Sequence, residues 1–218
     1  MMRFLIFGSP GAGKGTYTTR LKDKLGIAAI STGDVFRDAM KEGTQLGQLA
    51  KQYYDKGQLV PDKVVTGVLK GLLGQPGTQN GFILDGYPRT IKQAQDLKSL
   101  TTIDAVINLV VPEWVIVERL SSRRVCPKDG TIYNVRFLKP KVESVCDKCG
   151  GPLIQRQDDM PGVIRDRLKV YEAMTKPLLE FFQSTGLPIV SVECNEVDIP
   201  PEVMVEKILA ALRGRKLI

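Results

Sequence analysis

The chain has 218 residues, of which 43% are hydrophobic and 25% charged, and it carries a formal net charge of +7. This length allows one sizeable core with inserted lobes, and no apolar run is long enough to span a bilayer. The chain contains no histidine, which excludes an imidazole base, a Ser-His-Asp triad and a His-ligated metal. The positive charge predicts polyanionic partners, either nucleotides or nucleic acid.

The first predicted element is a buried strand over residues 3–7. The segment Gly8-Ser-Pro-Gly-Ala-Gly-Lys-Gly-Thr16 follows it and leads into a helical pattern over 13–25. A strand, a glycine-rich turn and a helix in this order are the context of a phosphate-binding P-loop. The glycines let backbone N–H groups converge on phosphate oxygens, and Lys14 adds a positive charge at the positive end of the helix dipole. Gly15 stands at the usual Ser or Thr position and Thr16 follows it; an ordinary glycine-rich turn is the alternative interpretation.

Two further strands lead to polar turns. Residues 28–30 predict a short strand before Ser31-Thr-Gly-Asp34, where Ser31 or Thr32 could cap a helix. Residues 82–84 predict a buried strand that runs into Asp85-Gly-Tyr-Pro-Arg89. An acidic residue at this end of a strand faces a ligand more often than it merely caps the next turn. Helical patterns are predicted at 34–41, 46–56 and 62–73.

The second half of the chain continues the alternation of strands and helices. Strands are predicted at 105–111 and 188–192, and helices at 112–124, 163–183 and 201–212. Apolar strands separated by helices predict an α/β fold of the P-loop NTPase type, with a parallel sheet covered by helices on both faces. Ligands of such sheets bind at the carboxyl ends of the strands, where both polar turns fall.

Residues 125–159 interrupt this pattern and carry three of the four cysteines. Cys126-Pro-Lys-Asp129-Gly and Cys146-Asp-Lys-Cys149-Gly share one template, and residues 131–138 between them predict a hairpin strand. Two such knuckles predict a zinc-ribbon-like site with ligands Cys126, Asp129, Cys146 and Cys149. Four protein ligands would close the coordination sphere, so the metal would be structural, with zinc expected and iron or cobalt as alternatives. Buried thiols or a disulfide are the other interpretations, and Cys194 is expected to be a small buried hydrophobe.

Taken together, these motifs resemble those of the adenylate kinases, in the long-lid form whose lid can carry zinc. The resemblance covers essentially the whole chain. It rests on the P-loop with its Gly-Thr after the lysine, on Ser31-Thr-Gly-Asp-Val-Phe-Arg37, on Gly81-Phe-Ile-Leu-Asp-Gly-Tyr-Pro-Arg-Thr90 and on the following Gln93. The chain departs from the family at Asp129, where a cysteine is usual, and at Val192-Glu193-Cys194, which replaces an apolar-Asp-Gly segment near the ATP base.

The resemblance implies a reversible phosphoryl transfer, ATP + AMP = 2 ADP, with Mg²⁺ accompanying ATP. The residues expected to act in catalysis are Lys14, Asp85, Arg89, Arg123, Arg156 and Arg167. The residues expected to bind ATP are Gly11, Ala12, Gly13, Lys14, Gly15, Thr16, Arg119, Arg123, Ile132 and Tyr133. The residues expected to bind AMP are Thr32, Arg37, Gln58, Leu59, Val60, Gly86, Tyr87, Arg89, Gln93, Arg156 and Arg167.

Within these sets, Thr16 and Asp85 are expected to hold Mg²⁺ through its waters, and Arg119 to stack on the ATP adenine. Gln93 is expected to read the AMP adenine, because its amide can both donate and accept. Asp158 and Asp159 are expected to orient lid arginines. The implied organisation is a core of residues 1–30, 61–122 and 161–218, a monophosphate-binding lobe at 31–60 and a lid at 123–160.

The expected partners are therefore ATP, AMP and ADP, with no nucleic acid and no membrane, and we expect a cytoplasmic monomer. The cytoplasmic location is expected because cleavage of a leader would destroy the P-loop. One alternative is a nucleoside monophosphate kinase that uses another acceptor, or GTP as donor. A more distant alternative is a P-loop protein whose zinc ribbon binds nucleic acid. That alternative would explain the charge and the cysteines, but it leaves Asp85–Arg89 without a role.

Overall fold

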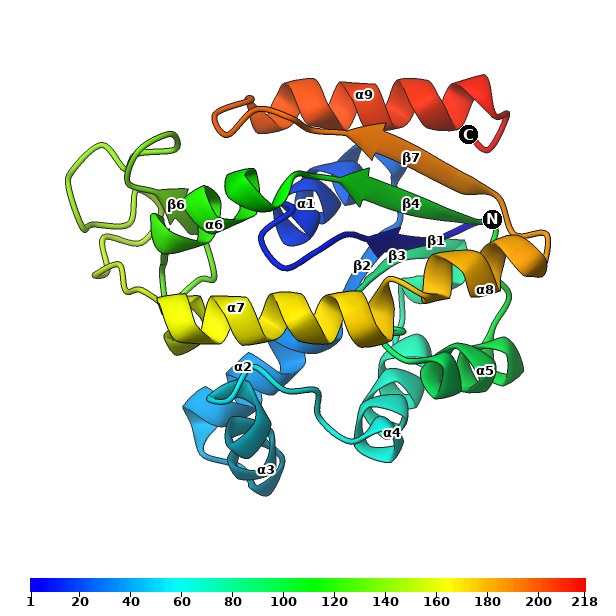
Figure 1. Cartoon of the computed structure of the whole chain (residues 1–218), viewed down its shortest axis with the longest axis horizontal. Helices are drawn as coiled ribbons and strands as arrows, with labels where there is room; N and C mark the ends of the chain where they lie inside the picture. Colours follow the sequence, from blue (N-terminus) through cyan, green and yellow to red (C-terminus); the bar gives the residue numbers. More distant parts are fainter.

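The computed structural model describes all residues 1–218 and has a parallel sheet at its centre (Figure 1). Its strands are β1 (Met2–Phe7), β2 (Ala28–Ser31), β3 (Gly81–Asp85), β4 (Ala105–Val110) and β7 (Ile189–Glu193). They lie in the order β2-β3-β1-β4-β7, and every neighbouring pair is parallel. The predicted α/β fold with a parallel sheet is confirmed, and the carboxyl ends of all five strands meet at one edge of the sheet.

The two faces of the sheet are buried in separate cores because neighbouring residues of a strand point to opposite sides. Phe4 and Ile6 of β1 belong to one core, whereas Leu5 and Phe7 belong to the other. Helices α1 (Lys14–Leu25), α6 (Glu113–Ser121) and α9 (Pro201–Gly214) pack in the first core. Helices α4 (Asp62–Leu73), α5 (Ile91–Leu100) and α8 (Leu178–Ser184) pack in the second. Burial on both faces explains why the strands read as continuous apolar runs.

Two segments project from this layered core at the left of Figure 1. One consists of α2 (Thr32–Glu42) and α3 (Gln45–Tyr54), whose backbones approach so closely that a Cβ on Gly47 would lie 2.0 Å from the Ala39 carbonyl oxygen. The other contains the antiparallel pair β5 (Arg123–Val125) and β6 (Ile132–Asn134), which lies outside the main sheet. The 3-10 turns η1 (Thr78–Asn80) and η2 (Gln157–Asp159) precede β3 and α7 (Pro161–Val170). No helix of the chain has both the length and the apolar character needed to cross a bilayer.

Two helical predictions differ from the structure, and one helix was missed. The helix predicted at 112–124 ends at Ser121, because Arg123–Val125 pair with Ile132–Asn134 instead; this tertiary pairing outweighs local helix propensity. The helix predicted at 163–183 is divided into α7, a π-helical turn η3 (Tyr171–Thr175) and α8. The break precedes Pro177, which lacks an N–H group and whose ring would clash with a carbonyl one turn earlier. Helix α5, capped by the Thr90 side chain, was not predicted.

Candidate active site

The loop between β1 and α1 has a backbone that favours glycine at three positions. Gly8, Gly11 and Gly13 have φ values of 144°, 85° and 94°, which L side chains rarely adopt. A Cβ on Gly11 would also lie 2.7 Å from the Leu120 Cγ, and one on Gly13 would lie 2.7 Å from the Tyr17 ring. The loop thus has the compact shape in which consecutive N–H groups can surround an anion.

The ammonium group of Lys14 is turned back onto this loop. Its Nζ donates to Gly8 O at 2.6 Å and to Ser9 O at 3.0 Å. Burial lowers the pKa of Lys14 to about 8; Asp85 opposes this shift and three nearby arginines add to it. Burial raises the pKa of Asp85 in turn, against the opposing effect of Lys14. A lysine whose charge is penalised by burial and by arginines is in a site that favours an anionic ligand.

The larger of two cavities beside the loop has a volume of about 440 Å³. Its wall also includes the end of β3, the lid hairpin and the segment after β7, from Val197 to Glu202. Of the residues predicted to bind ATP and its magnesium, those that line this cavity are Gly11, Gly13, Lys14, Gly15, Thr16, Asp85, Arg119, Arg123, Ile132 and Tyr133. The predicted donor residues are therefore brought together from segments far apart in the sequence.

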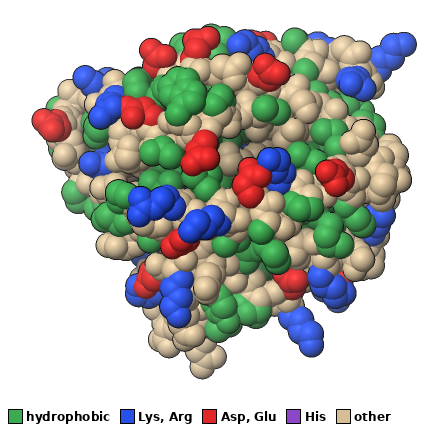
Figure 2. Space-filling view, in the orientation of Figure 1, with side chains coloured by type: hydrophobic (Ala, Val, Ile, Leu, Met, Phe, Trp, Pro, Cys, Tyr) green, Lys and Arg blue, Asp and Glu red, His purple; other side chains and the backbone are tan.

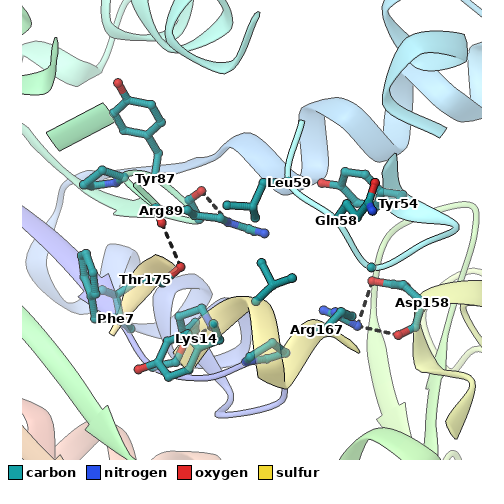
Figure 3. A pocket seen from close by; sticks show the side chains of 18 of the residues that line it. Phe7, Lys14, Tyr54, Gln58, Leu59, Tyr87, Arg89, Asp158, Arg167 and Thr175 are labelled. Atoms are coloured by element: carbon teal, nitrogen blue, oxygen red, sulfur yellow. Dashed lines mark hydrogen bonds and ion pairs between the residues drawn. The ribbon is translucent and has the colours of Figure 1, made fainter. Parts of the chain in front are cut away.

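The smaller cavity, of about 100 Å³, lies on the side of α2 and α3. Figure 3 shows Arg89, Lys14 and Arg167 around the same space, with Leu59 and Gln58 on the side of the helical lobe. Of the residues predicted to bind AMP, those that line this cavity are Arg37, Gln58, Leu59, Gly86, Tyr87, Arg89 and Arg167.

Several residues line both cavities, and most of them are cationic. The shared residues are Pro10, Lys14, Arg37, Gly86, Arg89 and Arg167. Four positive side chains at the junction of two cavities would neutralise two polyanions brought end to end. The junction is therefore the place where a group could pass from one polyanion to the other.

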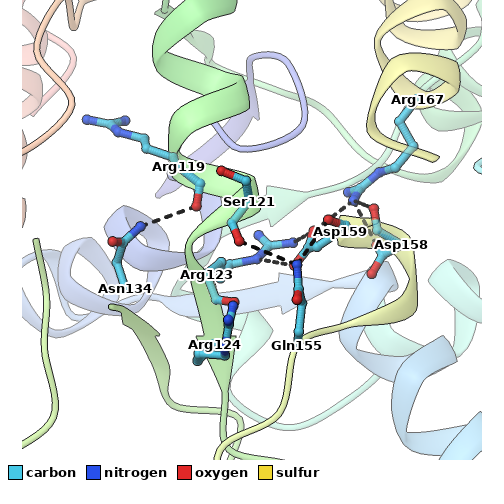
Figure 4. Close-up of polar contacts among 9 residues, drawn as sticks. All are labelled: Arg119, Ser121, Arg123, Arg124, Asn134, Gln155, Asp158, Asp159 and Arg167. Atoms are coloured by element: carbon cyan, nitrogen blue, oxygen red, sulfur yellow. Dashed lines mark hydrogen bonds and ion pairs between the residues drawn. The ribbon is translucent and has the colours of Figure 1, made fainter. Parts of the chain in front are cut away.

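Two buried carboxylates hold arginines on the lid side of the site (Figure 4). The Asp159 side chain is fully buried and accepts from Arg123 Nε at 2.8 Å and from Arg123 Nη2 at 2.5 Å. Arg167 Nη1 lies 2.9 Å from Asp158 Oδ2 and 3.3 Å from Asp159 Oδ1. Burial opposes ionisation of Asp158, but Arg167 and its neighbours leave its pKa lower than usual. Asp158 and Asp159 thus contact the arginines that they were expected to orient.

Arg156 has no carboxylate within ion-pair distance, in contrast to Arg123 and Arg167. Burial and the nearby Arg37 and Arg123 lower the pKa of Arg156 to about 9. It lines the larger cavity but not the smaller one. An arginine that forms no ion pair within the protein is available to an anionic ligand.

Arg119 is held by the segment that follows β7. Its Nε donates to Val197 O at 3.0 Å, and its Nη2 lies 2.8 Å from Glu196 O and 3.1 Å from Cys194 Sγ. Figure 4 shows its guanidinium directed away from Arg123 and the two carboxylates. Cys194 is buried in the core, as expected. Cys194, at which the chain departs from the expected pattern, and the carbonyls of the two residues 196 and 197 therefore support the arginine expected at the ATP base.

Four predicted residues do not line either cavity. Ala12 and Val60 are buried in the two cores, and Thr32 is buried with its hydroxyl donating to Gly86 O at 3.1 Å. Gln93 is also buried, and both ends of its amide are engaged: Oε1 accepts from Arg89 N at 2.7 Å and Nε2 donates to Asp62 Oδ1 at 2.8 Å. Nε2 keeps a second N–H and Oε1 a second lone pair, so burial rather than these two bonds separates Gln93 from an adenine.

The structure brings together the four predicted metal ligands in the lid. The ligand atoms of Cys126, Asp129, Cys146 and Cys149 all lie within 4.8 Å of one another. The Sγ atoms of Cys126 and Cys149 are 3.4 Å apart, and Cys146 Sγ is 3.2 Å from Asp129 Oδ2. Tetrahedral Zn–S bonds of about 2.3 Å separate their ligand atoms by about 3.8 Å. The set fits a four-coordinate metal, and all four cysteines of the chain are free of disulfides.

Sequence reasoning missed several residues of the site. Asp34 pairs with Arg37, and their spacing of three on a helix could have revealed this pair. Asn134 Nδ2 donates to Arg119 O at 3.2 Å and to Ser122 Oγ at 2.8 Å, which ties the lid hairpin to the end of α6. Nothing local in the sequence signals this contact.

Comparison with known proteins identifies a family. A family model described as adenylate kinase matches residues 6–187. An adenylate kinase of Carboxydothermus hydrogenoformans is 50% identical over 191 residues, which cover 85% of this chain and 89% of the relative. One of Archaeoglobus fulgidus is 48% identical over 191 residues, covering 85% and 88%. One of Acetivibrio thermocellus is 42% identical over 221 residues, covering 99% of this chain and 100% of the relative.

Proposed function

The chain belongs to the adenylate kinase family, and on that premise we propose how its residues perform the reaction ATP + AMP = 2 ADP. The protein is a phosphotransferase whose substrates are ATP, AMP and ADP, with Mg²⁺ accompanying ATP. The observation that carries the assignment of residues is that the two cavities meet at Lys14, Arg37, Arg89 and Arg167. One nucleotide occupies each cavity, and their phosphates meet at this junction.

The larger cavity takes ATP. The loop amides and Lys14 hold its β- and γ-phosphates, and Ile132 and Tyr133 bound it on the lid side. The Arg119 guanidinium lies against the adenine, since it is already held beside the segment after β7. Asp85 and Thr16 line this cavity. The Asp85 carboxylate can accept hydrogen bonds from the waters of the metal, and the Thr16 hydroxyl can donate to them. The Mg²⁺ that accompanies ATP neutralises phosphate charge when bound.

The smaller cavity takes AMP. Arg37 and Arg89 hold its phosphate, while the backbone of residues 58–59, Gly86 and Tyr87 surround the nucleoside, and Thr32 behind this wall holds the Gly86 carbonyl. Because the second pKa of a phosphate is about 6, the attacking oxygen is largely ionised near neutral pH. The reaction therefore needs no general base, in agreement with a chain that has no histidine.

Arg123, Arg156 and Arg167 stabilise the phosphoryl group during transfer, as charge spreads over its oxygens. Arg123 and Arg167 are pre-oriented by Asp158 and Asp159, so little reorganisation is needed at the moment of reaction. Arg156 has the freedom to follow either nucleotide, because no carboxylate holds it.

Residues 31–60 and 123–160 act as lobes that close on the substrates, with residues 1–30, 61–122 and 161–218 as the core. Closure would exclude water and so prevent hydrolysis of ATP. The lid metal is zinc with a structural role, because three thiolates and one carboxylate provide four ligands. The protein acts as a cytoplasmic monomer; four cysteines free of disulfides suit a reducing compartment.

The alternative of a nucleic-acid-binding protein has less support. On the face seen in Figure 2, positive and negative side chains are interspersed rather than gathered into one basic surface. The strongest cluster of cations lies instead at the junction of the two cavities, where an extended strand of nucleic acid has less access than a mononucleotide.

The test is phosphoryl transfer from Mg·ATP, and separately from Mg·GTP, to AMP, GMP, CMP and UMP, followed by formation of the diphosphates. We expect rapid turnover with ATP and AMP and at most weak turnover with the other acceptors. The matched variants Arg89→Ala and Arg213→Ala test the site, since Arg213 lies on α9 outside both cavities. An unchanged KM for AMP in Arg89→Ala would contradict the assignment of the smaller cavity.

A further inference from the structure

Thr175 lies in the wall of the smaller cavity, at the end of the π-helical turn η3. A threonine in a helix usually donates its hydroxyl to a carbonyl three or four residues earlier in its own helix. Thr19 does so in α1, where Oγ1 donates to Gly15 O at 2.9 Å. Thr175 instead donates to Arg89 O at 3.0 Å, across 86 residues of sequence. Its hydroxyl therefore serves another segment of the chain.

Arg89 lies in the turn between β3 and α5, so no regular backbone ladder holds it. Its N–H donates to Gln93 Oε1 at 2.7 Å, and its carbonyl accepts from Thr175. Its Nε donates to Gly86 O at 2.9 Å, which leaves both terminal nitrogens for a phosphate. Figure 3 shows Thr175 directly beside the Arg89 carbonyl, with the guanidinium extending into the cavity. The backbone of this arginine is thus fixed by two side chains, one on each side.

The π-helical turn is what presents this hydroxyl. Lys176 N donates to Tyr171 O at 2.9 Å, a bond five residues long that widens the helix by one residue. Such turns are frequent at functional sites. Thr175 is 9% exposed and Val170, Tyr171 and Thr175 all line the cavity. The irregular turn therefore faces the cavity and Arg89 together.

We propose that Thr175 is a positioning residue for the acceptor: through the Arg89 carbonyl it fixes the guanidinium that grips the phosphate of the nucleoside monophosphate. The proposal rests on the assignment of the smaller cavity to AMP. Arg167, which contacts the lid carboxylates, precedes Thr175 by eight residues, or about 12 Å of helix. The continuous helical stretch of α7 and η3 thus connects the arginine beside the lid to the arginine of the acceptor site.

The test compares Thr175→Val, which removes the hydroxyl and keeps the volume, with Thr175→Ser, which keeps the hydroxyl. Thr185→Val is the matched control, because it removes a hydroxyl that donates to a carbonyl, Phe182 O at 2.8 Å, outside both cavities. KM and kcat are measured for AMP and for ATP, AMP binding is measured by calorimetry, and Tm is recorded for each variant.

We expect Thr175→Val to raise KM for AMP about fivefold, the factor that corresponds to one ordinary hydrogen bond. KM for ATP should stay within about twofold, since a displaced Arg89 affects binding of the acceptor. Thr175→Ser should restore the KM for AMP, and Thr185→Val should leave both values unchanged. If Thr175→Val does not fold, Thr175→Ala takes its place with the same expectation.

A lower Tm with an unchanged KM for AMP would overturn the proposal, because it would assign Thr175 a structural role only. An equal rise in both KM values, or a failure of serine to restore the KM for AMP, would overturn it as well. Arg89→Ala distinguishes the positioning role of Thr175 from the assignment of the smaller cavity to AMP. If that variant raises KM for AMP while Thr175→Val does not, the positioning role fails and the assignment of the cavity stands.

Discussion

At the scale of single residues, the site is a set of charges held in place before the substrates arrive. Lys14 is half-buried and its pKa is lowered to about 8, and Asp159 is fully buried between Arg123 and Arg167. A buried charge weakens the fold unless it is well paired. Lys14 therefore costs stability in the free protein, whereas Asp159 is required to compensate its two arginines.

Replacement of Lys14 by methionine should remove activity and stabilise the fold. The shift of the Lys14 pKa from 10.5 to about 8 corresponds to at most about 3 kcal/mol at pH 7. This loss of folding free energy is complete below pH 8, where Lys14 is protonated in both the folded and the unfolded protein. It disappears as the pH approaches 10.5, where the unfolded protein also loses the proton. Thermal unfolding of the unmodified protein and of Lys14→Met at pH 7 and pH 10 measures this stability difference. The exposed Lys24→Met on the same helix is the control, and a lower Tm for Lys14→Met at pH 7 would contradict the argument.

Replacement of Asp159 by asparagine should destabilise the protein by about 3 kcal/mol, because two largely buried arginines lose the fully buried carboxylate that they share and Arg123 keeps no other ion-pair partner. The turnover number should also fall, since Arg123 and Arg167 would lose their orientation. Asp96→Asn is the control, because Asp96 pairs with Lys92 at the surface, where an ion pair contributes about 1 kcal/mol or less. Urea unfolding and initial rates measure both effects. An equal loss of stability in Asp159→Asn and Asp96→Asn would contradict the conclusion that burial makes the Asp159 ion pairs important for stability.

At the scale of elements, the proposed lid has a small hydrophobic core of its own. The buried residues of its cluster are Cys126, Tyr133 and Cys146, and its strands β5 and β6 have three residues each. Segments with so little apolar burial depend on a metal or a disulfide. None of the four candidate ligands lines either cavity, so a metal held by them would support this segment without contacting the phosphates.

Replacement of Asp129 by alanine, or removal of the metal with a chelator, should lower Tm more than it lowers turnover at 25 °C. Asp129 Oδ1 also accepts from Thr131 N at 2.9 Å, so the substitution loosens the knuckle as well as the ligand set. Elemental analysis measures the metal content, calorimetry the Tm, and initial rates the turnover. Asp147→Asn in the other knuckle is the control, because Asp147 is not a member of the ligand set. Loss of activity in a protein that stays folded would contradict a structural metal.

At the scale of the whole molecule, the sheet edge brings together segments that are far apart in the sequence. The P-loop follows β1, the Asp85–Arg89 turn follows β3, and the segment that holds Arg119 follows β7. The parallel order β2-β3-β1-β4-β7 places all of these ends on one side. The two projecting segments both contribute to the cavity walls, α2 and α3 through Arg37 and Tyr54 and the β5–β6 hairpin through Arg123 and Tyr133, so movement of either segment would change access to the site.

A bisubstrate analogue that links ATP to AMP should slow hydrogen exchange in residues 31–60 and 123–160, because closure orders both lobes. Exchange in residues 204–214 of α9, which line neither cavity and pack in the first core, should change little and serves as the internal control. Mass spectrometry of peptides measures the change. Unaltered exchange in both lobes at saturating analogue would contradict closure.

The sequence alone determined the features that short segments encode. The spacing of glycines and Lys14 after an apolar strand predicted the P-loop, the apolar runs predicted a buried parallel sheet, and the two knuckles predicted the metal ligands. Each of these depends on residues close together in the chain or on a repeated template, so that local pattern and chemistry are sufficient.

Only the tertiary structure decided which distant side chains meet. Arg119 finds its acceptors 77 and 78 residues later in the chain, and Thr175 reaches Arg89 across 86 residues. The π-helical turn, the end of α6 at Ser121 and the engaged amide of Gln93 follow from the same long-range packing. Such contacts are set by the order of strands and the helices packed on them, and they outweigh the local preferences that a sequence displays.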